Sequence, residues 1–126
     1  MIDEAPLRPL VWIGTTRKAF SSFPNEVKAE MGYALFVAQA GGLHRRAKPL
    51  KGFGGSGVLE VVSDFRGDTY RAVYTVRFAD TVFVLHAFQK KSSKGIATRH
   101  HDMRLIEDRL KAAELMAERS GKERLQ

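Results

Sequence analysis

The sequence predicts an α+β domain in which a small antiparallel sheet packs on helices. Apolar residues recur at helical spacing from residue 24 to residue 40, and a second helical pattern follows residue 98. Between them, segments rich in Val, Tyr, Phe and Thr are separated by two-residue breaks. Breaks this short join strands as hairpins, so neighbouring strands are antiparallel. The expected element order is β-α-α-β-β-β-α.

The N-terminal half is expected to supply one strand and two helices. Residues 6–13 favour a strand because Val, Trp and Ile suit extended backbone. Thr15 or Thr16 is expected to cap a short helix through its hydroxyl. The next helix begins at Pro24, which suits a first turn, and ends at Gly41-Gly42, where glycine takes the left-handed conformation. Its apolar stripe is expected to be Val27, Met31, Ala34, Leu35 and Ala38.

The C-terminal half is expected to supply the hairpins and a last helix. Three strands are predicted near 58–65, 69–78 and 81–89, with turns at Arg66-Gly67 and Ala79-Asp80. The last helix begins near residue 98 and runs into the 110s. Its buried seam is expected to be Met103, Ile106, Leu110 and Ala113.

The chain is expected to be a single domain over residues 1–126, with its core at about 7–115. The segment from Glu118 onward is charged and has no apolar stripe, so we expect this C-terminal tail to fray.

Two-residue turns would also fix which strand residues lie opposite one another. They place Val62, Arg71 and Phe88 in one row of the sheet, and Glu60, Val73 and His86 in the next. That face, which also carries Arg77, is expected to hold no helix and to form an open, basic cleft. The helices are expected on the opposite, apolar face, which collects Leu59, Val61, Ala72, Tyr74, Val76, Phe83, Leu85 and Ala87.

The distribution of charge predicts a polyanionic partner. The formal net charge is +7, and the excess is concentrated in two segments. Residues 44–57 contain four cations and no acid, and residues 89–104 contain five cations against one aspartate. Clustered cations favour a polyanion because several counterions are released together on binding. The alternative is a protein that is basic for solubility alone.

Several function classes are disfavoured by the same sequence. There is no cysteine, and the adjacent His100 and His101 would diverge on a helix, so no metal site is expected. The glycine-rich segment 52–57 lacks a Gly-Lys-Ser/Thr phosphate loop, and no cofactor is expected. No apolar run approaches the roughly 20 residues that span a bilayer, and the acidic N-terminal residues lack a signal-peptide pattern. We therefore expect a cytoplasmic protein that binds no membrane.

RNA cleavage requires a clamp for the phosphate, proton carriers and charge stabilisation. Arg71 is the candidate clamp and His86 the candidate proton carrier. Further catalytic candidates are Lys48, Lys51, Lys90 and Lys91. The candidate RNA-binding residues are Arg45, Arg46, Phe88, Lys94 and Arg77, where Phe88 offers a ring on which a base can stack.

Each candidate also has a purely structural interpretation. His86 can be a structural residue among valines, and Arg71 can simply pair with Glu60. Lysines beside glycines in loops are often only solvated, so the sequence leaves both interpretations open for Lys48 and Lys51.

The motifs resemble one known family. The segments Asp68-Thr-Tyr-Arg-Ala-Val-Tyr74 and Val82-Phe-Val-Leu-His-Ala-Phe-Gln-Lys-Lys-Ser-Ser-Lys94, followed by Asp102 and Arg109-Leu110, resemble the phage-derived, HigB-like branch of the RelE/ParE toxin superfamily. The upstream Lys48-Pro-Leu-Lys51 segment is similar to the same branch, and the resemblance covers residues from about 10 to 113. It implies a RelE-like fold and a toxin of a type II toxin–antitoxin system.

The resemblance further implies a ribosome-dependent mRNA endoribonuclease that works without metal through 2′-hydroxyl attack. Its implied partners are mRNA, the 70S ribosome and a cognate antitoxin, a helix-turn-helix protein of the HigA kind. By position, Arg71 matches the phosphate-contacting arginine of the family, Lys48 and Lys51 its basic loop, and Lys90-Lys91 its basic pair after the last strand. His86 belongs to the motif of this branch.

Two departures and two alternatives accompany the resemblance. The C-terminal tyrosine of several RelE-type toxins has no counterpart, since the last tyrosine is Tyr74, and Val62-Ser63 stand where relatives often have an arginine. The superfamily also contains ParE-like inhibitors of DNA gyrase that cleave no RNA. The other alternative is a decayed, non-catalytic nucleic-acid-binding protein.

Overall fold

The computed structural model describes residues 6–54, 57–90 and 96–124, and five strands of this part form one sheet in the order β1-β5-β4-β3-β2. β1 runs parallel to β5, and the other neighbours are antiparallel. The α+β class predicted from the sequence is therefore confirmed. The elements are β1 Leu10–Trp12, α1 Thr16–Ser21, α2 Asn25–Gln39, β2 Ala47–Pro49, β3 Val58–Phe65, β4 Asp68–Thr75, β5 Val82–Lys90 and α3 Ile96–Arg124.

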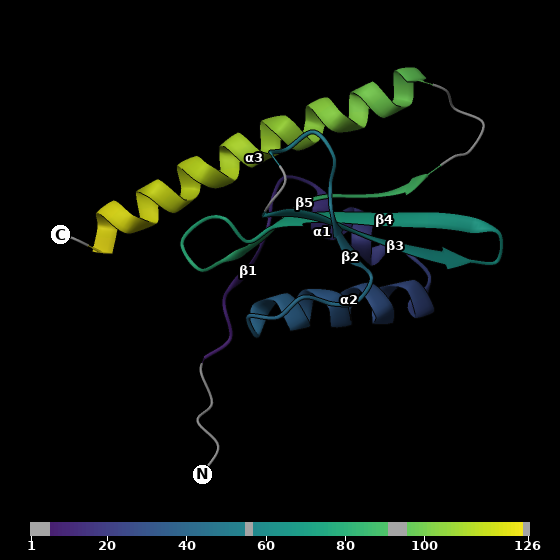
Figure 1. The fold of residues 1–126 in the computed structure, drawn as a ribbon, viewed down its shortest axis with the longest axis horizontal. Helices are drawn as coiled ribbons and strands as arrows, with labels where there is room; N and C mark the ends of the chain where they lie inside the picture. The colour runs from purple at the N-terminus through teal and green to yellow at the C-terminus, as the bar shows by residue number, and fades with distance from the viewer. Residues whose placement is uncertain (1–5, 55–56, 91–95, 125–126) are drawn as a thin grey trace, which may run out of the picture.

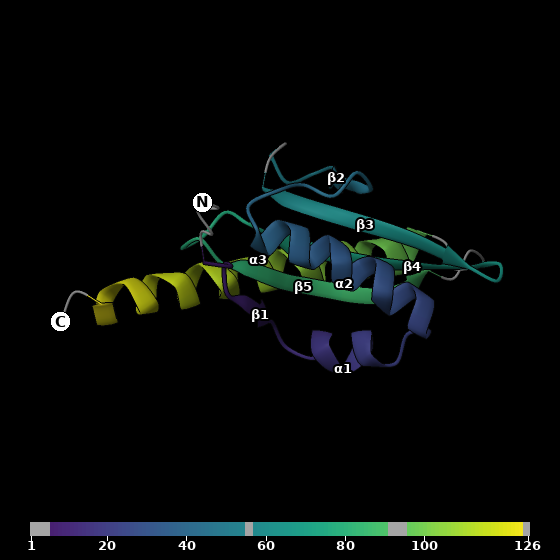
Figure 2. The ribbon, with the colours of Figure 1, turned by 90° about the horizontal axis from the view of Figure 1, so that it is seen from below.

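Helices cover both faces of the sheet. α2 lies against one face and α3 crosses the other, so the sheet is the middle of three layers (Figures 1 and 2). The expectation that all helices share one face is wrong. Its cause is a second apolar cluster on the face that was expected to be open, where Val73, Phe83 and Leu85 pack against Ile106 and Ala113 of α3.

The α2 side of the sheet contains the larger core. All five residues of the predicted α2 stripe are buried, from Val27 to Ala38. They pack against the side chains of Leu59, Val61, Ala72, Tyr74, Val82, Val84 and Ala87. Phe23 extends this cluster, with its ring 5.0 Å from that of Tyr70. Helical spacing alone therefore identified the residues that attach α2 to the sheet.

A β-bulge in β5 explains why the second cluster was not foreseen. Val73 lies opposite His86, but the next residue, Tyr74, lies opposite Val84, so Leu85 is an extra residue in its strand. A bulge places two successive side chains on the same face. Leu85 and His86 accordingly both face α3. The β5 side chains before the bulge point to the opposite faces from those that strict alternation would give. Phe83 and Leu85 were expected on the α2 side, and that expectation is wrong.

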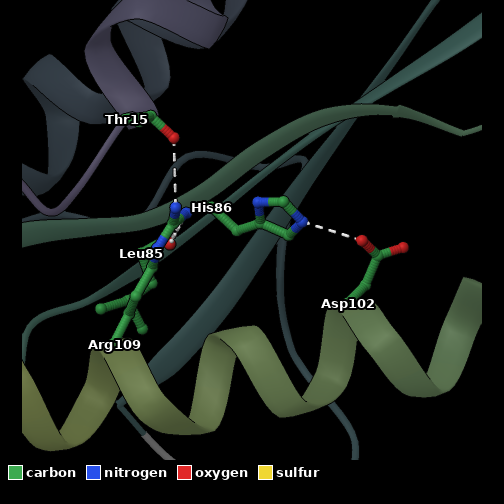
Figure 3. A network of polar contacts seen from close by, with 5 residues as sticks. All are labelled: Thr15, Leu85, His86, Asp102 and Arg109. Atoms are coloured by element: carbon green, nitrogen blue, oxygen red, sulfur yellow. Dashed lines mark hydrogen bonds and ion pairs between the residues drawn. The ribbon is translucent and has the colours of Figure 1, made fainter.

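Arg109 of α3 binds the backbone at this bulge. Its Nη1 donates to the carbonyl oxygen of Leu85 at 2.9 Å, and its Nη2 donates to Thr15 Oγ1 at 3.2 Å (Figure 3). A Cβ on Gly14, whose φ is +59°, would lie 3.1 Å from the guanidinium. Glycine there leaves room for the arginine, and Arg109 joins α3 to β5 and to the segment before α1.

Several element boundaries differ from the expectations. Thr15 occupies the N-cap of α1 but makes no side-chain cap, because its hydroxyl accepts from Arg109 instead. β2 was not expected as a strand. β4 ends at Thr75, which leaves Arg77 outside the sheet. α3 continues to Arg124 where fraying was expected from Glu118, and its last turns contain Ala, Glu, Arg and Lys, which are good helix formers.

Replacing Arg109 by leucine is expected to lower the free energy of unfolding by about 2 kcal/mol, because a hydrogen bond from a charged group to the bulge carbonyl is lost. Urea unfolding followed by circular dichroism measures this change. Arg104, an exposed arginine of the same helix, is the matched control, and its leucine variant should unfold like the wild type. Equal stability of the two variants would contradict this role of Arg109.

Replacing Ala79 by glycine is expected to stabilise the fold by about 0.5–1 kcal/mol. Ala79 has a φ of +53°, a conformation in which a Cβ is strained, and the relief exceeds the added entropy of the unfolded chain. Ala40, which ends α2 with a φ of −80°, is the matched control and should lose stability on the same substitution. Thermal unfolding compares the two variants, and a loss of stability in both would refute the strain at Ala79.

Candidate functional site

The α3 face of the sheet brings the predicted site residues into two adjacent rows. Val62, Arg71 and Phe88 lie opposite one another in the first row, as predicted. The second row contains Glu60, Val73 and His86, also as predicted, and β2 extends it. Lys48 on β2 lies opposite Glu60. Paired residues of neighbouring strands point to the same face, so Lys48 joins Arg71 and His86 on this side of the sheet.

Arg71 is held at the centre of this face by Glu60. Its Nη1 donates to Glu60 Oε2 at 2.8 Å, and the two side chains are 25 % and 21 % exposed. The Nε of Arg71 is buried without a hydrogen-bond partner in the described part of the chain. One edge of the guanidinium is thus fixed by a carboxylate while part of the group stays open to solvent. The structural pairing that the sequence left open does occur, and it does not cover the arginine.

His86 lies beneath α3 rather than on an open surface. Its Nε2 is 2.9 Å from Asp102 Oδ1 of α3 (Figure 3). Its ring stacks on that of Phe88, with the centroids 4.3 Å apart. Only 8 % of the residue is exposed. Burial lowers the pKa of His86, although the Asp102 carboxylate acts in the opposite direction. The expected open surface at this residue is therefore wrong, because α3 covers it.

The predicted lysines and arginines do not all lie on this face of the sheet. Lys48, Lys51 and Lys90 are exposed, as are Arg45 and Arg46. Lys91 and Lys94 lie outside the described residues. Of the exposed cations, Lys48 on β2 and Lys90 at the end of β5 lie on the same side of the sheet as Arg71, whereas Arg46 lies 3.6 Å from Glu30 of α2.

Arg77 has a different position from the one expected. It follows the end of β4, and its guanidinium donates to the carbonyl oxygen of Phe53. A Cβ on Gly57 would collide with the Arg77 side chain, so glycine is required there. Arg77 therefore contacts the loop that precedes β3 instead of lining the central face of the sheet.

Tyr74 does not supply the tyrosine that the sequence lacks near its C-terminus. Its side chain is fully buried on the α2 side of the sheet, and burial raises its pKa to about 12. It lies on the opposite face from Arg71, since successive strand residues alternate. Whatever chemistry this face performs therefore depends on residues other than Tyr74.

Two residues of the family motif were assigned no role in the site from the sequence. Asp102 and Arg109 are two helical turns apart on α3, and they bind His86 and the Leu85 carbonyl respectively. The predicted seam of α3 packs into the second cluster as Met103, Ile106, Leu110 and Ala113. An apolar seam on α3 must pack against an apolar surface. The seam was therefore the feature of the sequence that could have indicated a second helix layer.

The described residues show neither a metal cluster nor a membrane span. Among them, no group of three His, Asp or Glu side chains is placed to hold a metal ion. None of the helices in this part of the chain has the length and hydropathy to cross a bilayer.

Comparison with known proteins identifies the family. Residues 18–111 match the family described as phage derived protein Gp49-like. The chain belongs to this family. The Gp49-like match confirms the phage-derived, HigB-like branch that the sequence motifs indicated, a branch of type II toxin–antitoxin toxins.

A search of curated proteins found no match to this Gp49-like chain. Among solved structures, one similar chain comes from the toxin–antitoxin complex RelBE2 of Mycobacterium tuberculosis. It is 23 % identical, covers 71 % of this chain and 98 % of its own, and has a TM-score of 0.43. A likeness this distant does not define an activity.

The His86–Asp102 pair predicts how the stability of the Gp49-like protein depends on pH. The folded-state pKa of His86 lies below its usual value of 6.5, so the unfolded chain takes up the proton first. The free energy of unfolding should fall as the pH drops below about 6.5, by at most about 1.4 kcal/mol per pH unit from this group. The loss ends below the folded-state pKa.

Asp102→Asn removes the carboxylate that favours protonated His86, so it should lower the histidine pKa further and deepen the loss of stability in acid. Urea unfolding at about pH 7.5 and about pH 5.5 measures the difference. His86→Gln is the control, since it removes this contribution altogether. The same pH dependence in Asp102→Asn and wild type would show that the pair is not coupled.

Proposed function

We propose that this protein is the toxin of a type II toxin–antitoxin pair, and that it inhibits translation by cleaving mRNA on the ribosome. The observation that carries the proposal is the position of Arg71. It is partly exposed at the centre of a sheet face, with exposed Lys48 and Lys90 on the same side of the sheet. Membership of the Gp49-like family supports the toxin assignment.

Arg71 is suited to hold the phosphate at which cleavage occurs. A guanidinium presents several donors in one plane and can bind two phosphate oxygens at once. Glu60 fixes the orientation of the group through Nη1, and Nε is buried, so a substrate would bind to Nη2 and to the second N–H of Nη1. A preorganised donor stabilises the extra negative charge of the transition state without further reorganisation. The RNA 2′-hydroxyl would lose its proton and attack this phosphate, and the 5′-oxygen of the next nucleotide would leave and take up a proton. The product is a 2′,3′-cyclic phosphate, and the transfer needs no metal ion.

The lysines would supply the remaining positive charge, and Phe88 a stacking surface. Lys48 lies on β2, Lys51 follows that strand, and Lys90 ends β5. We propose the same role for Lys91. Phe88 lies directly opposite Arg71 in the sheet and is partly exposed. A base that stacks there would place its own phosphate within reach of Arg71. The candidates Arg45 and Arg46, which precede β2, would contact the RNA beyond the edge of the sheet, and we propose an RNA contact for Lys94 as well.

The burial of His86 determines its role in this proposal. Its Nε2 is bonded to Asp102 and the residue is almost fully buried, so proton transfer to a substrate requires α3 to move away. In the arrangement described here, His86 holds α3 and Phe88 in position. We therefore assign it the role of a positioning residue, with a direct proton-carrier role restricted to a state in which α3 is displaced.

The proposed partners are those of a translation-dependent toxin. They are mRNA, the 70S ribosome and a cognate helix-turn-helix antitoxin, and the site of action is the cytoplasm. The excess of cations on this face favours a polyanionic substrate such as RNA, because each bound phosphate releases condensed counterions.

Arg71→Ala is expected to reduce mRNA cleavage at least about a hundredfold, the cost of removing one donor that stabilises a transition state. The measurement is mapping of mRNA 5′ ends after induction of the protein in growing bacteria, where the wild type should give codon-phased cuts. Arg119→Ala removes an exposed cation of α3. This variant is the matched control and should cleave like the wild type.

A second variant separates catalysis from simple charge pairing. Glu60→Gln keeps Arg71 but removes its carboxylate partner, and it should retain cleavage. If Arg71 served only to neutralise Glu60, combining Arg71→Ala with Glu60→Gln would restore activity. Intact mRNA together with an SOS response would overturn the nuclease and indicate a gyrase inhibitor. Unimpaired growth would indicate a non-catalytic binding protein.

A further inference from the structure

An exposed aromatic and basic surface lies on the side of the sheet opposite Arg71. It consists of Tyr33 and Phe36 on α2 and of His44, Arg45 and Arg46 in the segment that leads to β2, and we call it the α2 surface. Tyr33 is 59 % exposed and Phe36 47 % exposed. These rings point away from the buried stripe of α2, so the core does not account for them.

The rings of the α2 surface are arranged as a platform. Tyr33 and Phe36 stack at a centroid distance of 6.4 Å with 26° between their planes. His44 meets Tyr33 edge-on, with the ring centroids 5.6 Å apart. The backbone N–H of Arg46 donates to His44 Nδ1 at 3.1 Å, which fixes the start of the basic segment against the platform.

Positive charge borders this platform on the side of the loop. Residues 43–54 contain Arg45, Arg46, Lys48 and Lys51 and no acidic residue. Both arginines are exposed, and Arg46 lies 3.6 Å from Glu30 of α2. That contact is a half-exposed surface pair, and a phosphate can compete for the arginine at little cost.

We propose that the α2 surface binds a single-stranded segment of RNA. Exposed rings next to guanidinium groups are the chemistry by which proteins hold unpaired bases, with the rings under the bases and the cations on the phosphates. An apolar protein partner would gain from Tyr33 and Phe36 but would have to cover Arg45 and Arg46 without supplying phosphates. The charge of the loop therefore favours RNA.

The position of β2 connects this surface to the proposed site of cleavage. Arg45 and Arg46 immediately precede β2, the edge strand of the sheet, and Lys48 on β2 points to the Arg71 face. A strand of RNA that leaves the α2 surface around this edge meets Lys48, and next the row that contains Glu60. The inference goes beyond the proposed nuclease, because binding here does not depend on cleavage.

The test is binding of a fluorescein-labelled single-stranded RNA of about 12 nucleotides, a length within the usual range of single-strand sites. Its 2′-O-methyl groups prevent cleavage by 2′-hydroxyl attack. Fluorescence anisotropy of the purified protein should show about tenfold weaker binding for Tyr33→Ala and for Phe36→Ala. Tyr33→Phe should bind like the wild type, because stacking needs only the ring.

The dependence of binding on salt distinguishes rings from cations. Loss of a stacking ring should leave the slope of log K against log salt unchanged, whereas Arg45→Ala should reduce its magnitude by about 0.7. Leu115→Ala and Arg119→Ala replace an exposed apolar residue and an exposed cation on α3, and they are the matched controls. The RNA affinity and salt slope of these two variants should differ from those of the wild type only as far as the change in net charge requires.

RNA affinity in Tyr33→Ala and Phe36→Ala equal to that of the wild type would overturn the inference. If light scattering then showed a dimer that these variants lose, the occupant of the surface would be a second copy of the chain. Failure of the nuclease proposal is separable, because a protein that leaves mRNA intact but binds this RNA through Tyr33 and Phe36 supports the inference by itself.

Discussion

One extra residue in β5 decides how the helix layers are attached. Leu85 interrupts the pairing of β5 with β4, so it and His86 point to the same face. That face becomes apolar enough to bind α3, and the strand continues on the other side of the bulge with Val82 and Val84 directed to α2. Without the bulge, Phe83 and Leu85 would join the core already filled by α2, and α3 would have little to cover.

The bulge also explains the polar contacts of α3. A bulge leaves backbone groups out of the strand ladder, and buried groups of this kind need other partners. Arg109 supplies a donor to the Leu85 carbonyl, and Gly14 leaves the space for its guanidinium. Asp102, two turns earlier, binds the histidine on the other side of the same bulge. α3 is thus positioned by side chains that bind the residues of this one bulge in the sheet.

This attachment determines which part of the α3 face remains accessible. His86 is covered, whereas Arg71 and Phe88 in the next row are partly exposed and Lys48 and Lys90 are exposed. The basic surface is therefore narrower than the open cleft that the sequence suggested, and it is displaced from His86 toward Arg71. On the other side of the sheet, α2 buries its apolar stripe and leaves Tyr33 and Phe36 in solvent next to the same basic segment.

The sequence by itself determined the elements with regular patterns. The five apolar positions of α2 and the seam of α3 follow from helical spacing, and the pairs Val62–Arg71 and Glu60–Val73 follow from the Arg66-Gly67 turn, because helical and strand periodicity are local properties. The motif of β4 and β5 likewise sufficed to indicate the family. Only the tertiary structure decided the bulge at Leu85, the layer in which α3 lies and the burial of His86. A bulge changes the side of the sheet to which every residue before it points, but it leaves the alternation on either flank unaltered. Its position depends on contacts with Arg109 and Asp102, which are distant from β5 in the sequence.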